Sequence, residues 1–338
     1  MSGTPRPRFD HLVNMTDGRG TFEHAKLAEP RHEHGYCTDD MARVLVVSAR
    51  EPRPDTAVQQ LVELSVRFLG DAQGLAGDYH NRMNSRGRWT DRRSFDDCWG
   101  RSVWGLGTAV AYTGAGWVRQ VALAQFERAA RRRSPWPRTM AFAAIGAAEV
   151  LTARPAHREA QALLAAAADM LSTKDDGLAW PWPEPTLEYA NAVIPEAMIA
   201  AGSLLDRPAL LRRGLDLLGW LLDHETIDGH LSVTPAGGST PGANRPAFDQ
   251  QPIEVAALAD ACARAAGVDG ANPTWADGVQ RAVAWFLGDN DGAHLMWDPA
   301  TGGGFDGLEP AGPNRNQGTE STLALLATLQ HARHLVPA

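Results

Sequence analysis

The feature that most constrains the fold of this 338-residue chain is a repeat of paired helical segments. Apolar residues recur with helical periodicity in eleven segments, and short turns rich in Pro and Gly, such as 51–54 and 113–116, join most of them into pairs. The predicted helices are 40–50, 56–69, 98–112, 118–130, 139–152, 158–171, 192–205, 209–222, 253–266, 275–287 and 320–331. Such pairs are αα-hairpins, and a chain built from them is all-α.

The two helices of a pair differ in composition. The first is apolar nearly all round, as in 104–111 and 141–148, which is typical of a helix buried on all sides, whereas the second keeps a charged face. The first helices begin near Asp39, Asp97, Thr139, Asn191, Gln250 and Gln317. The sequence therefore predicts one domain over residues 1–338, an (α/α)6 toroid of six helical hairpins with an inner and an outer ring. We expect segment 9–27 to supply the outer helix that the last hairpin lacks.

Composition narrows the classes of function. The formal net charge is -8 and the charges are mixed along the chain, so no basic patch is present that would bind nucleic acid or an anionic membrane. The first residues lack the apolar core of a signal peptide, and no run of about 18 apolar residues occurs. Cys37, Cys98 and Cys262 are few, odd in number and far apart, which argues against disulfides. We expect a cytoplasmic protein without nucleic-acid or membrane partners; the sequence sets no oligomeric state.

The connections that lead into the inner helices are long, and each ends in a polar cluster. The clusters are 33–40, 94–101, 134–138, 180–191, 248–254 and 314–320. Helix capping explains any one of them, because Ser, Thr, Asp and Asn accept hydrogen bonds from free amides at a helix start. Glu196, Glu254 and Glu320, however, lie within the first turns of apolar helices, where a lone buried carboxylate is costly. Six such clusters at one end of the toroid indicate a polar cavity.

The side chains in these clusters are those that bind a sugar. Carboxylates, carboxamides and arginine hydrogen-bond hydroxyl groups, and the apolar face of a pyranose packs on aromatic rings. The chain has 11 Trp but only 4 Tyr, and several Trp residues lie in the polar loops. The predicted carbohydrate-binding residues are His34, Tyr36, Trp99, Arg101, Arg138, Trp180, Trp182, Tyr189, Asn191, Gln250, Gln251, Asn316 and Gln317.

Cleavage of a glycosidic bond needs two carboxyl groups, one protonated and one ionised, that face each other across the bond. The candidates are Asp39, Asp40, Asp97, Asp249, Glu254 and Glu320. We expect an early aspartate to act as the base and a late glutamate as the acid. Glu254→Gln and Glu320→Gln are nearly isosteric, so both variants are expected to fold.

Segments 33–43, 248–254 and 316–322 resemble a bacterial group within the six-hairpin glycosidase superfamily, and the resemblance covers nearly the whole chain. Members of that group are often labelled glycosyltransferase, because the same domain occurs beside glycosyltransferase modules. The resemblance implies an enzyme that acts on glycosidic bonds, or a carbohydrate-binding relative of one. The chain has no alternation of strands and helices and no Gly-rich nucleotide-binding turn, which argues against a nucleotide-sugar donor. We expect no cofactor.

Three alternatives remain. A metal site would start from His34, Cys37 and Asp40, which are spaced three apart, but none of the standard paired zinc spacings occurs, so no metal is predicted. A sugar isomerase or epimerase would need a histidine pair as acid and base, and only His34 belongs to a principal cluster. Weaker candidates are His11, His24, His32, His80 and His230. A binding domain without catalysis would use the same pocket residues.

Overall fold

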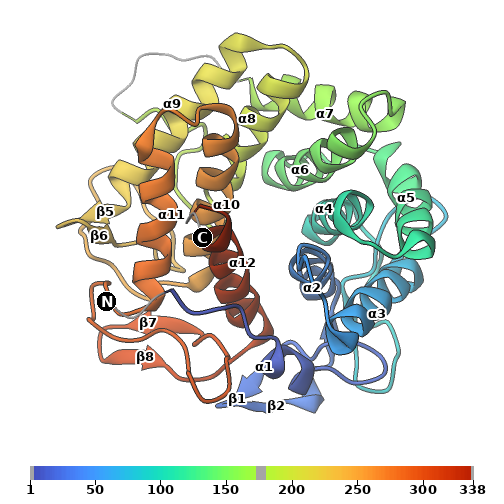
Figure 1. The fold of residues 1–338 in the computed structure, drawn as a ribbon, viewed down its shortest axis with the longest axis horizontal. Helices are drawn as coiled ribbons and strands as arrows, with labels where there is room; N and C mark the ends of the chain where they lie inside the picture. Colours follow the sequence, from blue (N-terminus) through green and yellow to red (C-terminus); the bar gives the residue numbers. More distant parts are fainter. Residues whose placement is uncertain (1–3, 173–179, 336–338) are drawn as a thin grey trace.

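The computed structural model describes residues 4–172 and 180–335, and it confirms the predicted all-α toroid. Six helices form the inner ring, and each contacts the next, with α12 packing on α2 to close the circle (Figure 1). They are α2 (Thr38–Ala49), α4 (Asp97–Tyr112), α6 (Pro137–Ala153), α8 (Val193–Leu204), α10 (Pro252–Val268) and α12 (Thr319–Leu335). Every residue of α2 is buried, including the charged Asp39, Asp40 and Arg43 of its first two turns.

The outer ring consists of the second helix of each hairpin, and these helices keep a solvent-exposed face. They are α3 (Thr56–Ala72), α5 (Gly116–Ala130), α7 (Arg158–Leu171), α9 (Pro208–His224) and α11 (Pro273–Phe286). The last position is taken by the N-terminal segment, as expected, but its helix α1 (Asp10–Asn14) has only five residues. It packs against α12 and α3, so the chain's two ends complete the toroid together.

Local sequence explains where the helices start and how closely they pack. Proline occupies the first turn of α6, α9, α10 and α11, where no intrahelical N–H is needed. The Asp55 carboxylate caps α3 by accepting from the Val58 N–H at 2.9 Å. Where α4 crosses α6, a Cβ on Gly107 would lie 2.1 Å from the Gly146 carbonyl oxygen, so the two backbones touch without side chains between them. The Gly- and Ala-rich inner helices are thus required by the narrow ring.

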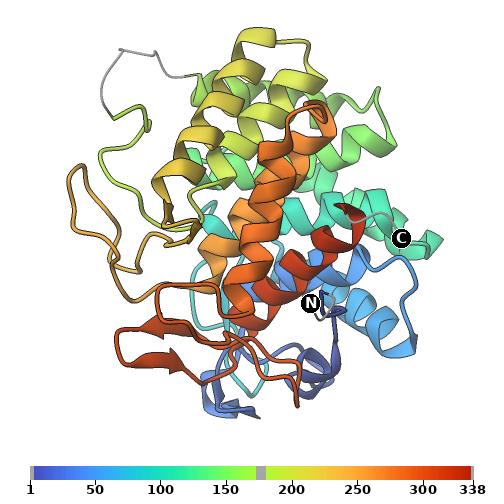
Figure 2. The same cartoon turned by 60° about the vertical axis from the view of Figure 1, so that its left-hand side comes forward.

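Short antiparallel strand pairs stiffen the long connections, within the residues that the structure describes. They are β1 (Ala25–Lys26) with β2 (Glu29–Pro30), β3 (Tyr36–Cys37) with β4 (Arg82–Met83), β5 (Thr226–Ile227) with β6 (His230–Leu231), and β7 (Gly307–Glu309) with β8 (Gly312–Asn314). Every pair belongs to a connection that leads into an inner helix, so these loops project from one end of the ring (Figure 2). This end carries the starts of the inner helices.

Candidate functional site

At the start of the inner helices, one guanidinium group joins two of the predicted catalytic carboxyl groups. Arg43 on α2 donates through Nη2 to Asp40 Oδ1 at 2.6 Å and through Nη1 to Glu320 Oε2 on α12, also at 2.6 Å. Arg43 and Asp40 are buried, whereas 41% of the Glu320 side chain is exposed. Glu320 is therefore the member of this group that a ligand can reach.

The two carboxyl groups differ in their protonation. Burial raises the pKa of Asp40 to about 7, even though Arg43 acts in the opposite direction. Burial also opposes ionisation of Glu320, but Arg43 and Arg101 outweigh it and hold the pKa of Glu320 below its usual range. At neutral pH Glu320 is ionised, while Asp40 is partly protonated.

Asp39 and Arg101 form a second, looser contact beside this group. The Arg101 Nη1 atom lies 3.6 Å from Asp39 Oδ1, and that oxygen has no hydrogen-bond partner among the described residues. The other Asp39 oxygen accepts from the Asn81 amide at 2.8 Å. The buried Arg101 guanidinium is held between the rings of Phe142, at 4.9 Å, and Tyr189, at 5.7 Å. Its position is fixed by packing, and its hydrogen-bonding capacity is largely unused.

Asp97 belongs to a polar cluster next to Arg101. Its carboxylate accepts from the Thr139 hydroxyl at 2.6 Å and from the Tyr189 hydroxyl. The buried Arg138 stacks on the Tyr189 ring at 4.9 Å and donates to the Tyr189 carbonyl and to Glu184. Burial raises the pKa of Glu184. The structure thus brings together three of the predicted site residues, Asp97, Arg138 and Tyr189.

Glu254 is hydrogen-bonded to the backbone of the loop before α8. Its carboxyl oxygens accept from the Ala190 N–H, from the Asn191 N–H at 3.1 Å and from the Asn191 side chain at 3.0 Å. Burial, reinforced by Glu225, raises its pKa to about 8. Because both oxygens are used and only 3% of the residue is exposed, Glu254 and Asn191 hold the loop before α8 instead of facing a ligand.

Two further aspartates lie in the loops near α10 and α12. Asp249 is half-buried, its Oδ1 has no partner among the described residues, and burial raises its pKa. Asp306, which is not among the predicted catalytic residues, accepts from the Gly318 N–H at 2.8 Å and the Ser321 hydroxyl at 3.0 Å. Burial raises its pKa to about 6, and the charge of Glu320 acts in the same direction. Asp306 is therefore held at the start of α12, near Glu320, and its pKa is raised.

Several predicted binding residues have their side chains in the core. Tyr36 is buried, stacks on Phe22 and donates to Asp17 at 2.7 Å. Trp99 is fully buried. Gln250 is also buried, and its amide donates to Asp291 at 2.6 Å.

The other polar and aromatic predictions lie at the rim or bind neighbouring loops. The Trp180 and Trp182 rings pack against Trp220 of α9. Asn316 and Gln317 fasten the N-terminal segment, because the Leu27 N–H donates to Asn316 Oδ1 and the Gln317 N–H donates to the Leu27 carbonyl, both at 2.9 Å. Gln251 is half-buried directly before α10, and His34 is exposed at the rim.

Below the carboxyl groups, the ring encloses two cavities. A narrow one, which we call the axial bore, has a volume of about 50 Å³ and is lined at the site end by Arg43, Arg101 and Glu320. A wider one, the C-terminal chamber, has a volume of about 880 Å³ and opens at the other end of the inner helices. Glu196 lies in the first turn of α8, as predicted, and lines both cavities.

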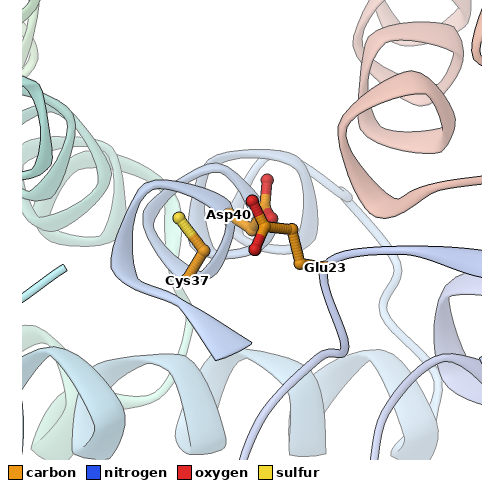
Figure 3. Close-up of side chains that lie close together, drawn as sticks. All are labelled: Glu23, Cys37 and Asp40. Carbon is orange, nitrogen blue, oxygen red and sulfur yellow. The ribbon is translucent and has the colours of Figure 1, made fainter. Parts of the chain in front are cut away.

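The sulfur and carboxyl groups near Asp40 do not make a convincing metal site. Figure 3 shows Glu23, Cys37 and Asp40 close together, with potential ligand atoms within 4.8 Å of one another; His34 is not among them. Burial holds the pKa of the Cys37 thiol well above its usual range, so the thiolate that a metal requires is disfavoured. Both carboxylates are already paired, Glu23 with Arg82 and Asp40 with Arg43.

Some residues near the site were given no contact by the sequence analysis, and they differ in whether the sequence offers a signal for that contact. Arg43 follows Asp40 by three positions on one helix, so its contact with that carboxylate could have been inferred. Asn81 lies in a loop without periodicity, and nothing in the sequence singles it out. Glu184 lies in the predicted cluster 180–191, His24 was a weaker histidine candidate and Asp306 lies in a Gly-rich loop, but the sequence predicts no contact for any of them. His24 contacts His34, with ring centroids 4.8 Å apart.

No helix within the described part of the chain is long and apolar enough to cross a membrane.

Comparison of sequences gives no match to a family model or to a curated protein. Solved structures do match. Cellobiose 2-epimerase from Bacillus thermoamylovorans is 12% identical, with a TM-score of 0.70 over 96% of this chain and 95% of that one. D-mannose isomerase is 11% identical, with a TM-score of 0.65 over 96% and 95%. A cellulase of C. cellulolyticum in complex with cellobiose is 10% identical, with a TM-score of 0.61 over 94% and 88%. The chain has the (α/α)6 toroid fold that these six-hairpin proteins share.

Proposed function

We propose that this protein is a carbohydrate-active enzyme, and specifically a glycoside hydrolase. The observation that carries the proposal is an ionised, accessible Glu320, held by Arg43, in the neighbourhood of two carboxyl groups with raised pKa values, Asp40 and Asp306. Two neighbouring carboxyl groups in opposite protonation states are what glycosidic cleavage requires. The first turns of the six inner helices contain no histidine, so carboxylates are the titratable groups that these helices offer for proton transfer.

Glu320 is the better base or nucleophile, because it is ionised and accessible. This assignment reverses the expectation that a late glutamate acts as the acid. For the acid we propose Asp306, whose pKa of about 6 leaves a protonated fraction near neutral pH and whose side chain is half-buried. Asp40 is less suitable, because only 3% of its side chain is exposed and Arg43 occupies it.

Arg101 and Asp39 are proposed to bind the sugar. Arg101 stacks on two rings with unused donors, and Asp39 Oδ1 has no partner among the described residues, so both have hydrogen-bonding capacity for hydroxyl groups once a small side-chain movement brings them to the ligand. We further propose that the enzyme acts in the cytoplasm on short oligosaccharides or glycosides. Activity on insoluble polysaccharide without activity on disaccharides would contradict this substrate class.

The acid and base roles are separated by the choice of leaving group. Asp306→Asn should lose at least about a hundredfold in kcat/KM on alkyl glycosides, which need a proton on the departing oxygen, but little on dinitrophenyl glycosides, which do not. Glu320→Gln should lose activity on both substrates, since the base acts whatever the leaving group. Asp216→Asn, which changes an exposed carboxylate on α9, is the control and should match the wild type.

Two results would count against these assignments. Equal losses on both substrates in Asp306→Asn would remove Asp306 as the acid. Full activity of a folded Glu320→Gln variant would remove the proposed base.

A sugar epimerase is the second candidate. It is favoured by the contact of His24 with His34 at the rim and by the neighbours named epimerase and isomerase. With ring centroids 4.8 Å apart, however, the two imidazoles leave no room for a sugar between them, since two van der Waals contacts need roughly 7 Å. Proton NMR of a disaccharide incubated with the enzyme decides: a C2 epimer without released monosaccharide, lost in His24→Asn, would favour epimerisation.

A further inference from the structure

An exposed tryptophan lies at the end of the ring that carries the candidate site. Among the described Trp, Tyr and Phe residues three are exposed: Tyr112 at 52%, Trp117 at 46% and Trp136 at 58%. Tyr112 ends α4 and Trp117 lies in the first turn of the outer helix α5, so both belong to the opposite end of the ring. Trp136 directly precedes the inner helix α6 and lies on the side of the site.

The backbone that carries Trp136 is rigid. Pro135 and Pro137 flank it; proline restricts its own φ and confines the residue before it to an extended conformation. Trp136 has that conformation, with φ −95° and ψ 122°, and Pro137 opens α6. The Trp136 N–H donates to Ser134 Oγ at 3.2 Å. Little conformational freedom therefore remains to be lost when a ligand binds here.

A hydrogen bond also orients the indole ring. Its Nε1 donates to Asp96 Oδ1 at 3.1 Å. Asp96 is the N-cap residue of α4, a position where aspartate often caps the helix, but here its side chain makes no capping hydrogen bond. The carboxylate binds the exposed indole instead and holds it in one orientation.

The same Pro–Trp–Pro sequence occurs at 181–183, and there the ring is buried. Trp182 is 4% exposed and stacks on Trp220, with ring centroids 6.1 Å apart. Packing in the core thus accounts for Trp182. Trp136 is not part of the hydrophobic core of the described residues, so core packing does not account for it.

Trp136 adjoins the polar cluster of Asp97. Thr139, in the first turn of α6, donates to Asp97 at 2.6 Å, and Tyr189 donates to the same carboxylate. The Tyr189 ring in turn lies 5.7 Å from the guanidinium of Arg101, which is proposed to bind the sugar. The exposed indole and Arg101 are therefore both next to one cluster.

The position of Trp136 in the ring sets the length of ligand that could reach it. Helix α6 is three places from α12 in the inner ring, so the two lie across it from each other (Figure 1). Neighbouring helix axes are 8–10 Å apart, so opposite axes in a six-helix ring are roughly 16–20 Å apart. A single pyranose does not span that distance. A ligand that reaches both Glu320 and Trp136 must contain several sugar units.

We propose that Trp136 is the platform of a separate subsite, which binds a further pyranose unit of an oligosaccharide held at Glu320. This inference rests on the proposed hydrolase function. The apolar face of the pyranose packs on the indole, as sugars pack on aromatic rings. Its hydroxyl groups bond to Asp96 Oδ2, which belongs to an exposed side chain and accepts no hydrogen bond within the described residues. The enzyme should therefore prefer oligosaccharides to glycosides of one sugar.

The test is binding as a function of ligand length. The probes are gluco-, manno- and galacto-oligosaccharides of one to four units, and the parent protein is Glu320→Gln, which should not cleave them. In calorimetric titrations we expect the affinity of the parent to rise about tenfold at one step in length. Trp136→Ala should lose this step and keep the parent affinity for shorter probes. Trp117→Ala, which removes an exposed indole at the other end of the ring, should match the parent at every length.

Two further variants separate stacking from a structural role. Trp136→Phe keeps an aromatic ring and should retain most of the step. Asp96→Ala frees the indole and should reduce the step to about threefold, with an unchanged Tm, because the Asp96 side chain does not cap α4.

Three results would overturn the subsite. One is equal affinity of Trp136→Ala and its parent at every length. Another is an equal loss at every length, which would place Trp136 in the central site or in the fold. The third is a change from dimer to monomer in Trp136→Ala, seen by sedimentation, which would assign the ring to an interface between copies.

The hydrolase function is judged separately. A wild-type protein that cleaves no glycoside, with the length step present in binding, would overturn the hydrolase function and leave the subsite in place. Absence of binding to every probe would overturn both.

Discussion

Arg43 on α2 and Glu320 on α12, 277 positions apart in the chain, form an ion pair of 2.6 Å between the first and last inner helices. The same guanidinium holds the buried Asp40. Closure of the ring and the protonation of the candidate catalytic groups thus depend on one side chain. The site can form only when the C-terminal helix has docked beside the N-terminal one.

Arg43→Met tests both roles of this side chain, its effect on the pKa of Glu320 and its contribution to the stability of the ring. Without the guanidinium, the pKa of Glu320 rises and the acidic limb of the kcat/KM profile shifts to higher pH, because a lowered carboxyl pKa is lost with its cationic partner. Stability should fall by about 3–5 kcal/mol, because the change leaves the buried Asp40 without its charged partner, as measured by urea unfolding. Arg67→Met, which removes an exposed pair on α3, should change neither quantity. An unshifted acidic limb in the folded Arg43 variant would contradict the role given to Arg43.

Glu254→Gln and Glu320→Gln should now differ in stability, although the sequence alone predicts that both fold. Three N–H groups point at the two oxygens of Glu254, and a carboxamide would turn its own NH2 toward some of them. Glu320 is partly exposed and can rotate. We expect a lower Tm for Glu254→Gln and a near wild-type Tm for Glu320→Gln. Equal Tm values would mean that Glu254 does not hold the loop before α8.

The fold could be predicted because small and apolar residues repeat with helical periodicity, and a ring of close-packed helices is the arrangement that buries them. The helix starts of the site were predicted for the same reason: Asp40, Arg101 and Glu320 are at fixed positions on those helices. Loop residues were not predictable, since Asp306 is brought to Glu320 only by the fold of the β7–β8 connection. Conversely, Gln250 has a side chain that could hydrogen-bond a sugar, but its amide instead donates to Asp291 inside the protein.

Asp260→Asn should destabilise the protein and reduce its sensitivity to acid. Burial alone would raise the pKa of Asp260, but Arg50 and His331 outweigh it and hold that pKa well below the usual range. A lowered carboxyl pKa contributes stability above about pH 4, its unfolded value, and this contribution is lost as the pH falls through the folded value. The variant should lose about 3–5 kcal/mol at pH 7 and show a flatter decline in Tm below pH 4.

The control for Asp260 is Asp169→Asn, which removes an exposed partner of Arg207 and should cost at most about 1 kcal/mol. A wild-type slope of Tm against pH in Asp260→Asn would show that this carboxylate is not the source of the acid sensitivity.

Gly107→Ala tests whether the inner ring depends on direct backbone contact. The new Cβ would lie 2.1 Å from the Gly146 carbonyl oxygen, so α4 and α6 must move apart, at a cost of about 1–3 kcal/mol. Gly267→Ala on α10 is the matched control: nothing lies within 4 Å of its added Cβ, and the loss of backbone freedom in the unfolded chain should stabilise the helix by about 0.5–1 kcal/mol. In denaturant unfolding we therefore expect Gly107→Ala to lower the free energy of unfolding and Gly267→Ala to raise it. A neutral Gly107→Ala would mean that the ring can widen freely, and the narrow bore would then not be fixed by helix packing.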